Sequence, residues 1–334
     1  MNTKWTKLLS AAFVLQLALI TATHWPGNEP SFANGEQPLL AEDLEAVDEV
    51  QVYGEDSAKV VLKKQQGDWV VSSYYNLPAA PGKIDQLISS LKELKSGWPV
   101  ATTATAAKRF EVTDDKFQRK VELLQDGSTI TSLYLGTSPG YRKVHARVDS
   151  QDNVFAVKFA THEVPTEGNS WVDTGLTAVP EDNITDIKFK DIELAKGSDN
   201  WQLSGLQANE TSNEEAIRKV LDALANLNFL EVLGTEPKPE YRLEEPKAHF
   251  ILALKDADSE GNKTLELTLT QPQEGDYYIL TRSDRPEIFK VPSFRVTALL
   301  DLNREGFYSA KVEGAPEVNL GQQSLENQEV TPAS

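Results

Sequence analysis

The sequence predicts an α+β protein made of two tandem copies of a mostly antiparallel sheet unit, each with one main amphipathic helix. Two helix-forming stretches carry the same apolar stripe at i, i+3, i+4, i+7 and i+10, one beginning at Ile84 and the other at Ile217. Aromatic landmarks around them keep nearly the same spacing: Trp69 with Trp201, Phe110 with Tyr241, and Phe155 with Phe289. Strand-like alternating runs recur between these landmarks in both halves. This agreement indicates a duplication.

The amino terminus is predicted to direct export. Lys4 and Lys7 precede the apolar run Leu8–Ile20, and the charge-free stretch continues to Trp25, as in a secretory signal peptide or a signal-anchor helix. As a helix, residues 8–25 would be about 27 Å long, which is marginally enough to cross a hydrocarbon core. The sequence leaves open whether this segment is cleaved. With either outcome the lysines stay inside and the rest of the chain is exported.

The remaining boundaries follow from composition. Between Leu8 and Ala58 there is no Lys or Arg but there are nine Asp and Glu residues, which indicates a polar linker. From Val312 onward the chain has no base and no aromatic residue, so this part is predicted to be disordered. The predicted segments are a signal or anchor at 1–25, an acidic linker at 26–46, α+β repeat 1 at 47–160, a connector at 161–182, α+β repeat 2 at 183–302 and an acidic tail at 303–334.

Within each repeat, two or three short strands ending in Trp precede the helix, and about four antiparallel strands follow it after an irregular stretch. Asp126-Gly127 predicts a tight hairpin in the first repeat. Ser212 with Glu215 predicts a capping box at the start of the second helix.

Charge and cysteine content exclude several classes of protein. The chain has 334 residues, 33 Lys and Arg against 51 Asp and Glu, a formal net charge of −18 and no cysteine. Without a thiol there is no disulfide framework, no Cys-ligated metal site and no thiol nucleophile. The acidic surplus argues against a nucleic-acid partner, because such proteins need clustered Lys and Arg to displace counterions from phosphates.

One sequence motif resembles a catalytic serine turn. Gly136-Thr137-Ser138-Pro139-Gly140 matches the G-x-S-x-G pattern of serine hydrolases. That chemistry needs a strand-to-helix turn, with a histidine base behind the serine. Here Pro139 follows the serine and the next segment alternates like a strand, so we expect a strand–turn–strand without a catalytic role.

A metal or histidine site has little support in the sequence. Asp256, Asp258 and Glu260 make a weak calcium candidate, but the twelfth position of that loop is Leu267 and its flanks are strand-like. No two histidines stand at a helical metal-binding spacing. We therefore predict no catalytic, cofactor-binding or metal residue and no cofactor, with that calcium site as the one weak alternative.

Several segments together resemble a bacterial family. They are the G-D-W after the first strand pair, PGKIDQLISSLKEL, LYLGTSPGYRKVHARV and WVDTGLTAVPEDNITDIKF. In combination they look like the family known as domain of unknown function 4340, over about residues 45–300. The resemblance implies an exported or membrane-anchored envelope protein, and some members are similar to auxiliary parts of gliding-motility-type ABC transport systems. It implies no catalytic residue.

The leading functional hypothesis is a non-enzymatic cell-envelope protein that acts as an interaction platform. Its expected location is the periplasmic side of the bacterial inner membrane, through residues 8–25, or outside the membrane after cleavage. Expected partners are envelope or membrane proteins, ABC transporter subunits among them. The alternative is a periplasmic hydrolase or small-ligand-binding protein using the cleft between the repeats. Its candidate residues would be Ser138, His145 and His162.

Overall fold

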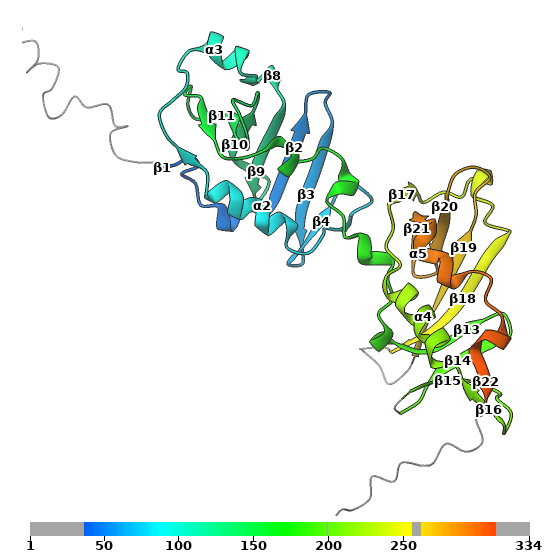
Figure 1. The fold of residues 1–334 in the computed structure, drawn as a ribbon. Helices are drawn as coiled ribbons and strands as arrows, with labels where there is room; N and C mark the ends of the chain where they lie inside the picture. Colours follow the sequence, from blue (N-terminus) through cyan, green and yellow to red (C-terminus); the bar gives the residue numbers. More distant parts are fainter. Residues whose placement is uncertain (1–36, 199, 256–261, 312–334) are drawn as a thin grey trace, which may run out of the picture. The chain divides into compact units, whose positions relative to one another are not determined.

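The computed structural model describes residues 37–198, 200–255 and 262–311. The predicted export segment and the calcium candidate Asp256, Asp258 and Glu260 lie outside these ranges. The chain forms two compact units that divide between Leu176 and Thr177, and each contains one eight-stranded antiparallel sheet with few helices (Figure 1). The predicted α+β class is confirmed.

The first unit is built on a meandering sheet with one helix across it. In spatial order the strands are β12 (Phe155–Val157), β11 (Val144–Val148), β10 (Ser128–Leu135), β9 (Arg119–Gln125), β2 (Glu49–Gly54), β3 (Lys59–Gln65), β4 (Asp68–Val71) and β5 (Leu77–Pro78). Helix α2 (Lys83–Lys92) lies across one face (Figure 1) and buries Ile84, Leu87 and Leu91 of the predicted stripe. Alternation along the strands turns Val50 and Val52 into the core.

Smaller elements cover the rest of the first unit. They are the strand pair β1 (Gln37–Pro38) with β6 (Lys95–Ser96), helix α3 (Ala104–Arg109), and the hairpin of β7 (Val112–Thr113) and β8 (Lys116–Phe117). The segment that contains α3 and β7 packs on the sheet face opposite α2. There Ala107, Val112, Tyr134 and Val154 form a second apolar cluster.

The second unit repeats this plan. Its sheet runs β15 (Trp201–Leu203), β14 (Ile192–Lys196), β13 (Ile184–Phe189), β18 (Pro246–Lys255), β19 (Asn262–Thr270), β20 (Tyr277–Arg282), β21 (Arg285–Pro292) and β17 (Glu231–Gly234). The main helix is α4 (Glu214–Ala225). A short helix α5 (Ser293–Val296) follows β21, and β16 (Glu210–Ser212) pairs with β22 (Tyr308–Ala310).

The two sheets have the same strand order. Reading β4-β3-β2-β9-β10-β11-β12 in the first unit gives the order β15-β14-β13-β18-β19-β20-β21 in the second. The main helix follows the Trp-containing strand in both. Only the added edge strands differ, β5 in the first unit and β17 in the second. The predicted duplication is therefore confirmed as two copies of one topology.

Three predicted boundaries move in the structure. The last part of the predicted acidic linker belongs to the first unit, because Leu39, Leu40 and Leu44 are buried. The connector also divides: Trp171 is fully buried before the division of the units and Thr177 directly after it. The predicted tail begins later than 303, because β22 pairs with β16 and Phe307 is buried.

The cap of α4 also differs from its prediction. Asn213, not Ser212, is the N-cap, and its side-chain oxygen accepts from the amide of Ala216 at 3.3 Å. The Ser212 hydroxyl instead accepts from the amide of Leu203, which ties β16 to β15. The hydrogen bond from Leu203 thus occupies the hydroxyl of the first candidate cap, and the helix starts one residue later.

Replacement of Asn213 by alanine is expected to lower the free energy of unfolding of the second unit by about 1 kcal/mol, since one helix amide loses its partner. Urea unfolding monitored by circular dichroism would measure the loss. Asn213→Ser keeps a capping oxygen and should recover most of it. Equal losses in the two variants would contradict the capping role.

Candidate functional site

The face of the first sheet opposite α2 carries a row of alternating cations and aromatic rings, which the segment of α3 and β7 covers in part. Five adjacent strands each contribute one residue to this row, and the antiparallel register places these residues side by side. In order from β3 to β11 they are Lys59, Tyr53, Lys120, Tyr134 and Arg147. We call this set the cation–aromatic row.

Each cation of the cation–aromatic row lies over a neighbouring ring. Lys59 and Lys120 are 5.0 and 5.4 Å from the centre of the Tyr53 ring. Lys120 and Arg147 are 5.5 and 4.5 Å from the centre of the Tyr134 ring. A cation at such distances is attracted by the electrons of the ring face. The five side chains therefore stabilise one another across the sheet.

Acidic groups complete this network and change its ionisation. The Tyr53 hydroxyl donates to Glu122 at 2.9 Å, and burial together with this carboxylate raises the pKa of Tyr53. Burial opposes ionisation of Glu122, but hydrogen bonds from Lys120 and Tyr53 hold its pKa below the ordinary value. Asp114 accepts from Tyr134 and from Arg147, which lowers the pKa of this carboxyl. Against the effect of burial, hydrogen bonds within the network raise the pKa of Lys120, so the charged forms of Lys120, Glu122 and Asp114 are favoured at neutral pH.

The second unit lacks this arrangement. The paired positions His249, Thr268 and Thr281 on β18, β19 and β20 stand where the first unit has Lys120, Tyr134 and Arg147. There His249 contacts the Thr268 hydroxyl at 3.1 Å. The two copies have kept their topology and diverged on this face.

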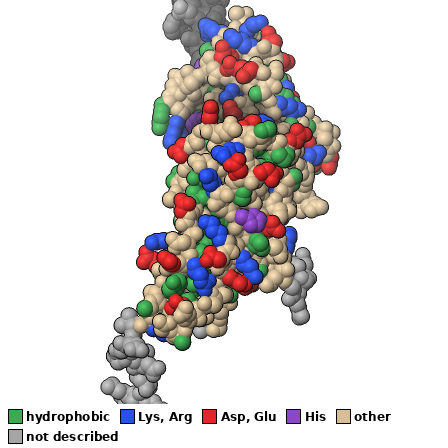
Figure 2. Space-filling model, turned by 90° about the vertical axis from the view of Figure 1, so that its right-hand side faces the viewer, with side chains coloured by type: hydrophobic (Ala, Val, Ile, Leu, Met, Phe, Trp, Pro, Cys, Tyr) green, Lys and Arg blue, Asp and Glu red, His purple; other side chains and the backbone are tan. Residues whose placement is uncertain are grey.

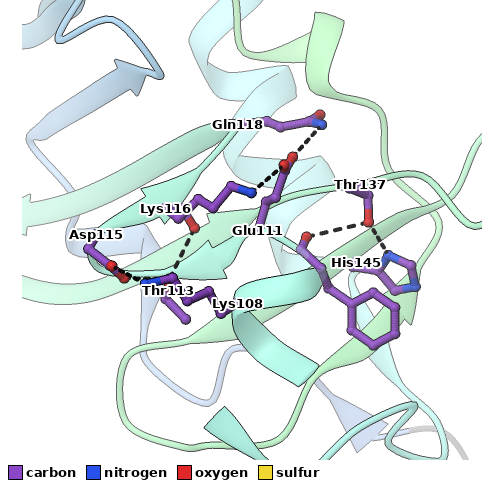
Figure 3. Close-up of polar contacts among 9 residues, drawn as sticks. Lys108, Glu111, Thr113, Asp115, Lys116, Gln118, Thr137 and His145 are labelled. Atoms are coloured by element: carbon purple, nitrogen blue, oxygen red, sulfur yellow. Dashed lines mark hydrogen bonds and ion pairs between the residues drawn. The ribbon is translucent and has the colours of Figure 1, made fainter. Parts of the chain in front are cut away.

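Beside the row, the chain passes directly over the end of β10 (Figure 3). The amide of Thr137 donates to the carbonyl of Phe110 at 2.9 Å. The Thr137 hydroxyl lies 2.9 Å from Nδ1 of His145, whose ring stacks on the Phe110 ring with centroids 4.0 Å apart. A side chain at Gly136 would begin 1.9 Å from the Phe110 carbonyl oxygen, so this crossing requires glycine.

His145 is a buried packing residue in this arrangement. Its counterpart by strand register in the second unit is Ile279, which belongs to an apolar cluster with Tyr241, itself the counterpart of Phe110. The imidazole ring thus fills the place of an aliphatic side chain.

Ser138 holds the turn that follows. Its hydroxyl lies 2.8 Å from the carbonyl of Gly140 and 2.7 Å from that of Lys143, and it accepts from the amide of Gly140. The segment runs from β10 through this turn into β11, as the sequence predicts. His162 lies apart on a 3-10 turn, Thr161–Glu163. No hydrogen bond found among the described residues joins His145 to Ser138 or His162, so the structure does not assemble them into a catalytic set.

Exposed ion pairs surround the crossing (Figure 3). Lys108 pairs with Asp115 at 2.9 Å, and Lys116 pairs with Glu111 at 3.0 Å. Gln118 also donates to Glu111, and these hydrogen bonds lower the pKa of Glu111. Such exposed pairs contribute little stability. Their effect is to neutralise Lys108 of α3 and Lys116 of β8 locally.

In each unit the landmark tryptophan lines a hollow of its own beside the main helix. In the first unit a groove of about 720 Å³ is lined by Trp69, Ile84 and Asp85 among others, and the indole nitrogen of Trp69 donates to Asp85 at 3.3 Å. In the second, Trp201 and Ile217 line a pocket of about 140 Å³, and Trp201 donates to Glu181 at 2.9 Å. The duplicated Trp therefore keeps its place beside the main helix and donates to a carboxylate in both units. The spacing of the tryptophans in the sequence did not reveal this hydrogen bond.

Within 37–198, 200–255 and 262–311, no group of three or more His, Asp or Glu side chains could hold a metal ion. In those same ranges no helix is both long and apolar enough for a membrane span. The calcium candidate and residues 8–25 fall elsewhere in the chain.

Because His145 is buried, we predict that the stability of the first unit falls in mild acid. Burial lowers the pKa of His145 below 6.5, and Arg109 adds to this effect. Because the unfolded chain then binds the proton more tightly, the stabilising contribution of the neutral ring is present above pH 6.5 and is lost as the pH falls toward the lower folded pKa. The urea midpoint of the first unit should fall between about pH 7.5 and 5.5.

His145→Gln should reduce this fall, and His162→Gln, in the same unit but exposed, should leave it unchanged. Urea titrations at the two pH values would measure both effects. An unchanged pH dependence in His145→Gln would contradict the assignment.

A known family model matches the middle of the chain. The family described as Domain of unknown function (DUF4340) matches residues 69–246, which extend from β4 of the first unit to the start of β18 in the second. The comparisons with curated proteins and with solved structures gave no match. Since the family match spans just over half of the chain, the protein belongs to the DUF4340 family.

Proposed function

We propose that the protein is a non-enzymatic component of the bacterial cell envelope, held by residues 8–25 on the periplasmic side of the inner membrane. Its two units would serve as a platform for other envelope proteins. Subunits of an ABC-type transport complex are the partners that we expect first.

The observation that carries this proposal is the contrast between topology and surface. The two units keep one strand order and separate apolar cores, yet the sheet face away from the main helix has a cation–aromatic row in one and His249 with two threonines in the other. Lys59 is the exposed end of the row, whereas Tyr134 is buried beneath the segment that contains α3 and β7. A duplicated scaffold that preserves its interior and differs on the sheet face away from its main helix is suited to contacting different partners. Function then resides in the surfaces and not in the shared fold.

The contacts of Ser138 and His145, the candidate catalytic residues near the row, support a structural role for both. The Ser138 hydroxyl bonds to main-chain groups of its own turn, and His145 stacks on Phe110. A nucleophile and its base would need to lie within hydrogen-bond reach of each other.

A photo-crosslinking residue at Lys59, the exposed end of the row, would test the proposal in intact membranes. We expect covalent adducts with transporter subunits that also copurify with the unmodified protein. The same photo-crosslinking residue at Ser128, on the exposed β9–β10 turn, serves as the control and should give no such adduct. Equal yields at both positions, or adducts with the protein itself alone, would contradict a specific platform.

A further inference from the structure

We propose that the loop between β10 and β11, residues 137–143, contacts the anionic headgroups of the membrane to which the chain is tethered. This inference rests on the proposed membrane anchor. It assigns a lipid-binding role to one end of the first unit, apart from the cation–aromatic row and its protein partners.

The first observation is an uncompensated group of cations. From Gly127 to Val148 the chain has no Asp or Glu, in a protein of net charge −18. Two bases of the neighbouring elements are paired with acids, Lys108 with Asp115 and Lys116 with Glu111. By contrast Arg109, Arg142 and Lys143 are exposed and make no ion pair within the part of the chain that the structure describes.

These three cations lie at the same end of the sheet. Arg109 stacks on the Phe110 ring at 4.9 Å, and that ring stacks on His145 at the start of β11. Arg142 and Lys143 precede His145 on the loop itself. Figure 2 shows Lys and Arg side chains at the upper end of the molecule with Asp and Glu side chains beside them, and Figure 1 shows α3 and β8 at that end.

The second observation is an aromatic side chain presented to solvent among these cations. Tyr141 is 86% exposed, more than any other large apolar or aromatic side chain in the described ranges. Arg142 lies over its ring at 5.4 Å. Tyrosine beside Arg and Lys is typical of residues at a membrane interface, where the ring reaches the headgroup level and the cations meet lipid phosphates.

The loop is also held in one shape. The Ser138 hydroxyl bonds across it to the carbonyls of Gly140 and Lys143, and Gly140 forms a bridge with Lys143. Arg142 adopts a left-handed backbone with φ of 53°. A residue with a side chain keeps this conformation where the surroundings impose it. Tyr141 and its neighbours are therefore presented without a large loss of loop entropy on contact.

The tether places this unit near a bilayer. Residues 26–36 separate the proposed anchor from Gln37, and eleven residues span at most about 40 Å. The acidic body as a whole is repelled by anionic lipid. Charges are screened beyond about 10 Å at ordinary ionic strength, so at contact the local cations decide the sign of the interaction. An anionic lipid surface thus fits the loop better than any neutral one.

The absence of cysteine makes a direct test possible. Gly140→Cys gives a unique labelling site next to Tyr141, and a Cβ there meets no atom within 4 Å. Ser128→Cys, at the opposite end of β10, is the matched control. Each full-length variant carries an environment-sensitive fluorophore and is reconstituted into vesicles of phosphatidylcholine alone or with phosphatidylglycerol.

With phosphatidylglycerol, the emission from position 140 should shift to the blue and be quenched by a headgroup nitroxide, and position 128 should show neither effect. Adding Arg142→Gln and Lys143→Gln should abolish both responses, because each removed cation weakens contact about fivefold. No response at position 140, or equal responses at both positions, would overturn the inference. A response that requires an added acidic protein and not the lipid would also overturn it.

Flotation with phosphatidylcholine vesicles separates this test from that of the anchor. A chain that does not float has no stable anchor, which contradicts the proposed function. A chain that floats without a response at position 140 retains its anchor and contradicts only the loop contact.

Discussion

Replacing Gly136 by alanine is expected to lower the free energy of unfolding of the first unit by about 3 kcal/mol. The added Cβ would lie 1.9 Å from the Phe110 carbonyl oxygen and 2.5 Å from that of Glu111. Both are backbone atoms, so no side-chain rotation relieves the clash. The segment after α3 would have to lift from the sheet, which breaks the hydrogen bond from Thr137 to Phe110 and separates the rings of Phe110 and His145.

Hydrogen exchange during a urea titration would measure this loss in the full-length protein. Peptides from β9 and β10 report the first unit, and peptides from β18 and β19 report the second as an internal reference. The matched control is Gly140→Ala in the same turn, where an added Cβ meets nothing within 4 Å, and it should change stability by less than about 0.5 kcal/mol. Similar stabilities for the two variants would show that the backbone crossing is not rigid.

The first Gly of the G-x-S-x-G motif shows what sequence can and cannot reveal here. Pro139 and the alternating residues after it correctly predict a strand–turn–strand. The requirement for glycine arises because a segment some 25 residues earlier in the chain, at Phe110, passes over the strand. No pattern within the motif contains that information. Gly136 is required by the close approach of the Phe110 backbone. Ser138 is required by the hydrogen bonds that hold the following turn.

The fold class could be predicted correctly from the sequence because it depends on local periodicity. A stripe such as that of Ile84, Leu87 and Leu91 needs only the helix itself to be recognised. The cation–aromatic row needs the register between five strands, and its residues come from separate segments of the chain. Alternation shows that Tyr53 and Lys120 face away from the core, but it does not show which strands are neighbours. The cation–aromatic row could therefore be recognised only once the pairing of the strands was known.

The domain boundaries differed from their predictions for a related reason. Leu39, Trp171 and Phe307 are apolar residues in stretches that are polar on average, and each is buried. Average composition along a stretch hides a single large side chain that fixes the segment to a core. The cap of α4 differs from its prediction for a similar reason, because the Ser212 hydroxyl accepts from the amide of Leu203 on β15 and Asn213 caps the helix instead.

Replacing Trp171 by alanine is expected to lower the free energy of unfolding of the first unit by about 4 kcal/mol. Trp171 is fully buried, although it lies in the segment that composition assigned to a connector. Its indole nitrogen donates to the carbonyl of Pro165 at 2.9 Å, and Lys83 at the start of α2 lies 5.2 Å from its ring centre. Alanine leaves a large cavity and an unpaired carbonyl oxygen.

The measurement is the same exchange-monitored urea titration, with the second unit again as reference. Trp171→Ala should shift the peptides of the first unit and leave those of β18 and β19 within about 0.5 kcal/mol, because the residue belongs to the first core alone. Trp98→Ala is the matched control in the same unit: Trp98 is 68% exposed, so we expect a loss below about 1 kcal/mol. A loss spread equally over both units would mean that residues 161–176 connect two coupled cores. A loss confined to the first unit would make Trp171 the residue that fixes this segment to the first repeat.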